Sequence, residues 1–493
     1  MADPTPPDGA SIDVARRIGW VLRMSRALAP GGITMDDVAQ HGGFTLAQVQ
    51  RCETGRTRAG RVTDAFEEVL GLAPGALRSV IDQQCRWYDN SPVDRDPGDP
   101  DPTPEVLNDL LDRVRRPGAR GSDWLRWSRA MGVSRAVGLP VDLFLEVTDE
   151  LVRQLSLAAG PSYTTRFEAL ARLRSGPYGE LVLARVAEHI ARPGTQVILD
   201  LTSAMGSTVS PSAIAWALEL LDDPEMAMAG AVLLEELALS TARDGDRTFW
   251  PYVAPRLVTL LNAHPDPSTA RESIAHCLRL APPAELAACP VRPDAPLPPV
   301  QDVPGNPREL RDAHLAECEE MSARITTTLG LPEEPMLTRL LYDIVFSPRL
   351  ARSVNSCLLL HAVPPLADLA QEQLALLARR NRSKKVRLRA ARRVNSLIHG
   401  PAPAVTREWV ADPDPVLRAC GLRCAGTGGL VLPDEVLRTA FTDGLVEEAL
   451  YAAGMTGSAL VTAWAQDDDL DPALRAAAGW WAATGSRVLD PPT

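Results

Sequence analysis

The sequence predicts an all-α protein in which a small N-terminal helical domain precedes a long array of packed helix pairs. Three observations indicate this fold. Apolar residues recur at helical spacing along most of the chain, and no stretch shows the convincing period-two alternation of a β-strand. Aromatic residues are only 5% of the chain, and alanine and leucine, both strong helix formers, are abundant. A motif of about 30 residues also returns near the C-terminus.

Length and charge limit the classes of protein that fit this sequence. A chain of 493 residues is too long for one compact core, and its formal net charge of −12 argues against a surface covered with nucleic acid. No secretion signal and no run of about 18 apolar residues is found, so we expect a cytoplasmic protein without membrane contact. Its eight cysteines are then reduced thiols. Among 51 basic residues only Lys384 and Lys385 are lysines, which is typical of a GC-rich bacterial genome.

Two proline-rich segments divide the chain. Residues 85–104 include DNSPVDRDPGDPDPTP, a composition that predicts an extended linker after an N-terminal domain at residues 11–84. Residues 290–307 form either a hinge or a loop within one continuous array. They separate two helical regions, residues 105–289 and residues 308–493.

The C-terminal region contains a sequence repeat. Three segments begin at Asp414, Asp443 and Asp471, and each closes with Thr-Gly. Asp-Pro supplies an N-cap and a proline at the first helical position, and glycine ends the helix. One such unit cannot bury its own apolar face, so neighbours must stack. The repeat resembles short HEAT-like repeats, and this resemblance implies an α-α solenoid after the N-terminal domain.

Residues 34–58 contain two short helical segments joined by a glycine turn. Thr34, followed by two acidic residues, begins the first, and Thr45 begins the second. Val49 and Cys52 face inward. The outward positions are Leu46, Ala47, Gln48, Gln50 and Arg51. Two short helices around such a turn make a helix-turn-helix.

This stretch resembles the Cro/repressor-type helix-turn-helix of the XRE family. The resemblance covers about Ala15 to Gly75, a small part of the chain. The matching residues follow the spacing Ala39-x3-Gly43-x-Thr45-x3-Val49-x3-Glu53-x-Gly55. The resemblance implies a five-helix domain whose second short helix enters the major groove of double-stranded DNA. The chain departs from the family at Met35, where a glutamine often touches phosphate.

The resemblance also implies which residues contact DNA. Base edges would be read by Leu46, Ala47, Gln48 and Gln50. Phosphates would be held by Thr34, Thr45, Arg51, Arg56, Thr57 and Arg58. Glu53 would be structural and paired with Arg26 of the first helix.

Other candidate sites are weaker. The basic segment at residues 379–393 is either a partner-binding surface or a solvated helix face. Its candidate residues are Arg382, Lys384, Lys385, Arg389, Arg392 and Arg393. Cys420 and Cys424 lack the further ligands of a zinc site, so we expect buried thiols and no metal. No phosphate loop, nucleophile elbow or HExxH motif occurs, so neither an enzyme nor a cofactor is predicted.

Together these patterns predict a sequence-specific DNA-binding transcription regulator of a GC-rich bacterium. Its solenoid would bind a protein, a peptide or a small-molecule effector. One small head contacts few phosphates, so we expect a homodimer on a two-fold operator. The alternative is a protein-interaction scaffold whose helix-turn-helix is a docking surface.

Overall fold

The computed structural model describes residues 12–88, 102–133, 138–244, 247–264, 268–294, 307–347, 350–381 and 383–490. Within these ranges the protein contains 27 helices and no strand longer than a single bridge, which joins Ala158 to Val488. The prediction of an all-α protein is confirmed.

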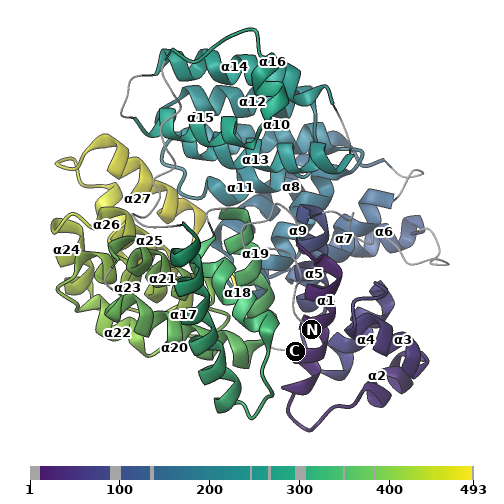
Figure 1. Ribbon diagram of the computed structural model, residues 1–493. Helices are drawn as coiled ribbons and strands as arrows, with labels where there is room; N and C mark the ends of the chain where they lie inside the picture. Colours follow the sequence, from purple (N-terminus) through teal and green to yellow (C-terminus); the bar gives the residue numbers. More distant parts are fainter. Residues whose placement is uncertain are drawn as a thin grey trace.

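The helices form three groups, which Figure 1 shows as purple, blue to teal, and green to yellow segments. The first group, here called the head, consists of α1 (Val14–Ala27), α2 (Met35–Gly42), α3 (Leu46–Glu53), α4 (Gly60–Val69) and α5 (Ala76–Tyr88). The first half consists of α6 (Pro104–Val114), α7 (Gly121–Val133), α8 (Val141–Leu157), α9 (Pro161–Ser175), α10 (Gly179–Ile190), α11 (Leu199–Met205), α12 (Pro211–Asp222), α13 (Ala227–Asp244), α14 (Phe249–Ala263), α15 (Thr269–Leu280) and α16 (Pro283–Ala288). The second half consists of α17 (Pro307–Thr328), α18 (Pro335–Phe346), α19 (Leu350–His361), α20 (Pro364–Arg380), α21 (Lys384–Ser396), α22 (Val405–Val410), α23 (Pro415–Gly428), α24 (Asp434–Thr442), α25 (Val446–Thr456), α26 (Leu460–Ala465) and α27 (Pro472–Thr484).

The predicted linker begins later than the sequence indicated. Helix α5 continues to Tyr88, and the side chains of Cys85 and Arg86 are buried, so residues 85–88 belong to the head. Most of the predicted linker, residues 89–101, lies outside the described residues, as do residues 295–306 of the predicted hinge or loop. The linker begins later than predicted because packing of α5 keeps residues 85–88 helical, although the sequence that follows them is rich in Asp and Pro.

The head is built into the body of the protein instead of being held only by a linker. Its buried apolar residues form one continuous core with those of α17 to α23. Arg17 of α1 donates to Asp343 of α18 over 2.6 Å, and neither side chain is exposed. On the other side, Arg86 of α5 donates to Glu168 of α9 over 2.7 Å. Helices α1 and α5 therefore anchor the head between the two halves.

The C-terminal segment returns to the first half. The backbone amide of Val488 donates to the Leu157 carbonyl over 2.9 Å. The Asp490 carboxylate accepts a hydrogen bond from Arg166, whose side chain is buried, over 2.9 Å. This seam joins residues after α27 to α8 and α9, so the two halves meet at a second place besides the head.

The repeat segments form the helices α23, α25 and α27, and each packs on the next. Asp414 and Asp471 accept hydrogen bonds from the Val416 and Ala473 amides over 3.0 and 2.8 Å, as N-caps do. Asp443 does not act in this way: it is the C-cap of α24 and pairs with Arg418 at 2.6 Å. No proline follows Asp443, and the helix starts later, at Val446.

Candidate nucleic-acid interface

Helices α2 and α3 are two short helices that follow one another at the place the sequence predicted. The two helices are separated by a turn in which Gly43 adopts the left-handed conformation, with φ of 67°. Thr34 caps α2 and Thr45 caps α3, both through capping boxes. Val49 and Cys52 are buried, as the spacing predicted.

A buried ion pair holds α3 against α1. The two carboxylate oxygens of Glu53 accept hydrogen bonds from Nε and Nη2 of Arg26 over 2.5 and 2.9 Å. The hydrogen bond to Glu53 raises the pKa of the Arg26 guanidinium. The predicted pairing is confirmed, and Glu53 has a structural role.

Two glycines, Gly19 and Gly55, allow α1 to cross the end of α3 closely. A Cβ at Gly19 would lie 2.6 Å from the Glu53 carbonyl oxygen and 2.6 Å from the Gly55 nitrogen. Gly55 has φ of +71°, and a Cβ there would overlap the Ala15 carbonyl. Backbone atoms cannot move aside as side chains do, so both positions require glycine.

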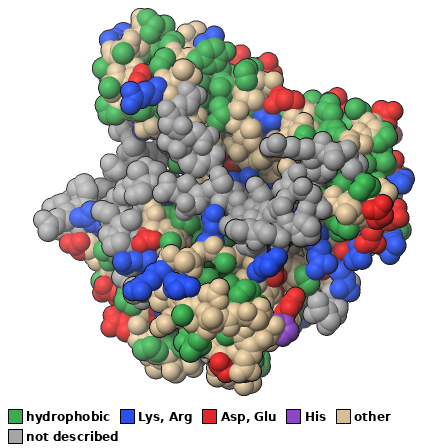
Figure 2. Space-filling model, turned by 90° about the vertical axis from the view of Figure 1, so that its right-hand side faces the viewer, with side chains coloured by type: hydrophobic (Ala, Val, Ile, Leu, Met, Phe, Trp, Pro, Cys, Tyr) green, Lys and Arg blue, Asp and Glu red, His purple; other side chains and the backbone are tan. Residues whose placement is uncertain are grey.

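The outward face of α3 is open to solvent. Figure 1 shows α2, α3 and α4 at an outer corner of the molecule, while α1 and α5 extend toward its centre. All five predicted outward residues are exposed: Leu46, Ala47, Gln48, Gln50 and Arg51. Figure 2 shows groups of basic side chains on the lower half of the face that carries the head, beside largely uncharged surface. This corner can approach a large partner without rearrangement of the body.

The two predicted base-reading glutamines differ in their freedom. Oε1 of Gln48 accepts hydrogen bonds from the amide and hydroxyl of Thr45 over 2.7 and 3.0 Å, which leaves only its Nε2 available. Adenine recognition needs both the oxygen and the nitrogen of a glutamine side chain. The Gln50 side chain forms no hydrogen bond with another described residue, so it is the better candidate for this contact.

The structure does not support a phosphate contact by Thr34. Its amide and its hydroxyl both donate to the Asp37 carboxylate over 2.7 Å. These bonds lower the pKa of Asp37, which keeps the carboxylate charged. A second carboxylate, Asp36, is exposed in the same first turn. Two negative charges at this helix start repel a phosphate. Thr45 has a neutral partner and carries no such penalty.

The predicted phosphate-binding arginines fall into two classes. Arg51 and Arg56 are exposed and form no ion pair with another described side chain, and Thr57 beside them is exposed as well. Arg58 is half-buried and donates to Sγ of Cys85 in α5. Arg58 therefore links the loop after α3 to the last helix of the head, which sequence spacing could not show.

The basic segment at residues 379–393 has the character of a solvated helix face. Arg379 and Arg380 pair with Glu408 and Glu317 over 2.5 and 2.6 Å. Arg387 pairs with Asp414. Of the predicted patch, Lys384, Lys385 and Arg392 are exposed, Arg389 and Arg393 are half-buried, and Arg382 lies outside the described residues. Acidic neighbours therefore pair with Arg379, Arg380 and Arg387, three of the nine basic residues in this segment.

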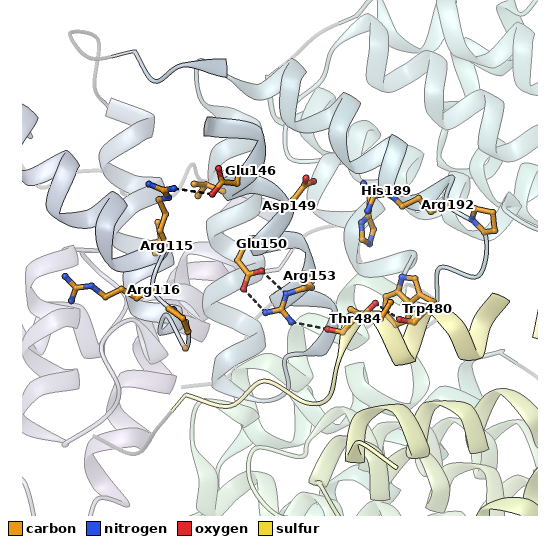
Figure 3. Close-up of a pocket in the computed structure, with 16 residues that line it drawn as sticks. Arg115, Arg116, Glu146, Asp149, Glu150, Arg153, His189, Arg192, Trp480 and Thr484 are labelled. Atoms are coloured by element: carbon orange, nitrogen blue, oxygen red, sulfur yellow. Dashed lines mark hydrogen bonds and ion pairs between the residues drawn. The ribbon is translucent and has the colours of Figure 1, made fainter. Parts of the chain in front are cut away.

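A cavity of about 840 Å³ lies at the seam between α6, α8, α10 and α27 (Figure 3). Its wall carries both signs of charge. Arg153 pairs with Glu150 at 2.6 Å and donates to the Thr484 carbonyl over 3.0 Å, and Arg115 lies 3.4 Å from Glu146. Four of the lining charges therefore satisfy one another in pairs, while Arg116 and Arg192 also line the cavity.

Sequence reasoning missed three carboxylates that share a different cavity, of which Glu235 and Glu236 are buried and Asp200 is partly exposed. Asp200 lies on α11, and Glu235 and Glu236 lie on α13. The signal for two of them was present, since Glu235 and Glu236 interrupt the apolar run AVLLEELAL. Adjacent acids inside such a run are unusual, because a buried charge needs a partner.

The predicted burial of Cys420 and Cys424 is confirmed, and the other six cysteines are buried as well. Burial raises the pKa of Cys420 to about 11 and also raises that of Cys424. Among the described residues no group of three or more His, Cys, Asp or Glu side chains is placed to hold a metal ion. No described helix combines the length and the apolar character needed to span a bilayer.

Comparisons with protein families, with curated proteins and with solved structures gave no match to this chain.

Proposed function

We propose that the protein is a sequence-specific DNA-binding transcription regulator. In this proposal α3 of an XRE-type head reads the major groove, and a HEAT-like solenoid receives an effector or partner. The observation that carries the proposal is the outward face of α3. Gln50 and Arg51 on this face and Arg56 just after it are exposed and have no side-chain partner among the described residues, whereas Arg26 and Arg58 of the same head make internal contacts.

The contacts assign different tasks to the residues of this face. Gln50 can pair with adenine, and the exposed Leu46 and Ala47 can contact a thymine methyl group. Arg51, Arg56 and Thr57 can bind phosphates on either side. This small set of phosphate contacts gives modest affinity, so we propose that two chains bind a two-fold operator as a homodimer.

The test begins with selection of bound sequences from a random double-stranded DNA pool. The affinity of the full chain for the selected DNA is then measured against salt concentration. Log K falls as log salt rises, and each lost phosphate contact reduces the steepness of this fall by about 0.9. Arg51→Ala with Arg56→Ala is therefore expected to lower the slope by about 1.8. Gln50→Ala is expected to relax the preference at one base pair.

Two control variants separate DNA contact from folding. Arg438→Ala removes an arginine that is 56% exposed on α24, remote in sequence from the head, and is expected to leave the slope unchanged. Arg58→Ala is expected to lower thermal stability and leave the slope unchanged, because its guanidinium faces α5. An unchanged slope in the Arg51/Arg56 variant would overturn the proposal and favour the protein-interaction scaffold.

A further inference from the structure

A cavity of about 240 Å³ lies where the head meets both halves of the protein. Its walls come from α5 of the head, from α9, α11 and α13 of the first half, and from α19 of the second half. Figure 1 shows these helices converging at the centre of the molecule. This volume equals that of about eight water molecules in the liquid, which is enough for a small organic molecule.

Three carboxylates line this cavity together with the polar side chains of Gln83, Tyr163, Ser203 and Asn355. Asp200 accepts a hydrogen bond from the Tyr163 hydroxyl over 2.7 Å, and Glu236 accepts one from the Ser203 hydroxyl. Oε2 of Glu235 lies 3.2 Å from Nε2 of His276. Each carboxylate uses one oxygen in these contacts, and its other oxygen has no hydrogen-bond donor among the described residues.

A fourth acceptor comes from the head. Gln83 of α5 is 1% exposed, and its Nε2 donates to the Thr164 carbonyl over 2.9 Å. Its Oε1 has no donor among the described residues. Gln83 lines the cavity, so this oxygen can accept a hydrogen bond from a donor group bound there.

No lysine or arginine is among the described residues that line the cavity. Arg86, which borders the neighbouring space, is hydrogen-bonded to Glu168 and Ser175. Burial accordingly raises the pKa of both Asp200 and Glu236. The raised pKa favours the neutral form of both carboxyl groups, and a cation with several N–H donors would stabilise their charged forms.

The remaining wall is aromatic. Trp87 of α5 and the pair Tyr163 and Phe167 of α9 line the same space, and the two rings of that pair lie 5.7 Å apart. Aromatic faces attract organic cations and also pack against flat apolar groups. The described carboxylates are not grouped as metal ligands, so N–H donors on an organic group fit them better than a bare ion.

We propose that this cavity binds a small organic cation, an amine or amidine carried on a flat apolar group. The head contributes Gln83 and Trp87 to the site, and the solenoid contributes the carboxylates. A bound cation would contact the head and both halves at once. It would thereby change the orientation of α3, or the free energy needed to move α3 relative to the two halves. The binding step does not depend on the proposed DNA function, whereas this regulatory consequence rests on it.

Isothermal titration calorimetry of the full chain tests the binding step without DNA. The probes are phenethylamine, benzamidine, 2-phenylethanol and phenylacetate, which share a phenyl ring and differ in charge. We expect the two cations to bind at least about tenfold more tightly than the alcohol and the carboxylate. No binding of either cation up to about 10 mM, or equal binding of amine and alcohol, overturns the proposal.

Variants then locate the site. Asp200→Asn combined with Glu236→Gln keeps the shape of the cavity and removes two charges, so it is expected to abolish the preference for phenethylamine over 2-phenylethanol. Glu219→Gln, at an exposed position on α12, is the matched control and is expected to retain it. Preference retained by the double variant would place the site elsewhere. The wild-type comparison decides the proposal even where the double variant does not fold.

A final arm measures DNA affinity with and without phenethylamine. A change in affinity supports the regulatory consequence, and an unchanged affinity overturns that consequence alone. Failure of the chain to bind DNA would overturn the proposed function and would leave the calorimetric result standing.

Discussion

Asp343 is the residue whose replacement tests most directly how the head is held. Its carboxylate accepts a hydrogen bond from Arg17 of the head over 2.6 Å and lies 3.3 and 4.0 Å from Arg339 and Arg352 of the second half. All four side chains are at most 7% exposed. Asp343→Asn would leave three buried guanidinium groups around a neutral amide.

Breaking a buried pair by removing one partner costs about 3–5 kcal/mol, because the remaining charge is buried without compensation. Arg17→Met is expected to cost less, about 1–3 kcal/mol, since Asp343 keeps its contacts with Arg339 and Arg352. Arg113→Met serves as the control, because its pair with Asp109 is exposed, and should change stability by less than about 0.5 kcal/mol.

Hydrogen exchange resolved by segment is the suitable assay, because a chain of this size need not unfold in one step. A loss of 3 kcal/mol corresponds to exchange faster by about a hundredfold. We expect this acceleration in both α1 and α18 of Asp343→Asn. If α1 exchanged no faster than in Arg113→Met, the head would not be held through this contact and the reasoning would fail.

Three further outcomes follow from contacts in the head and the second half. Gly19→Ala should destabilise the head by more than about 2 kcal/mol in urea melts, whereas Gly132→Ala, with no atom within 4 Å of the added Cβ, should not. Glu53→Gln should cost about 1–3 kcal/mol by weakening the bond to Arg26, and equal stability of mutant and wild type would contradict that. Burial lowers the pKa of His361 from 6.5 to about 4. The unfolded chain therefore binds a proton that the folded protein does not, and stability should fall as pH drops from about 6.5 to 4. His361→Gln should remove about 3 kcal/mol of that dependence in melts across this window.

Local spacing was sufficient to predict the parts of the head that depend on neighbouring residues. The caps at Thr34 and Thr45 and the exposed face of α3 follow from helical periodicity, and the pair between Arg26 and Glu53 was predicted from a resemblance to a known family. That Asp37, and not a phosphate, would bind Thr34 could also have been predicted, because the capping box is visible in the sequence.

Contacts between distant segments could not be predicted in this way. Arg17 has the sequence pattern of an ordinary surface arginine on an amphipathic helix, yet it is buried against Asp343, 326 residues later. Arg58 stands among arginines that face solvent and differs from them only because Cys85 of α5 lies beside it. Periodicity reports which face of a helix is apolar, and it does not report that a polar face will be covered by another part of the chain.

The seam between the C-terminal segment and the first half has a consequence for biosynthesis. Arg166 leaves the ribosome 324 residues before its partner Asp490. Until then the nascent first half has a guanidinium without its carboxylate and an open edge beside Leu157. Domains usually fold in the order in which they are synthesised. Here a segment made more than 300 residues later completes the first half, so a chain stalled before residue 488 should be an unusually good substrate for chaperones and proteases.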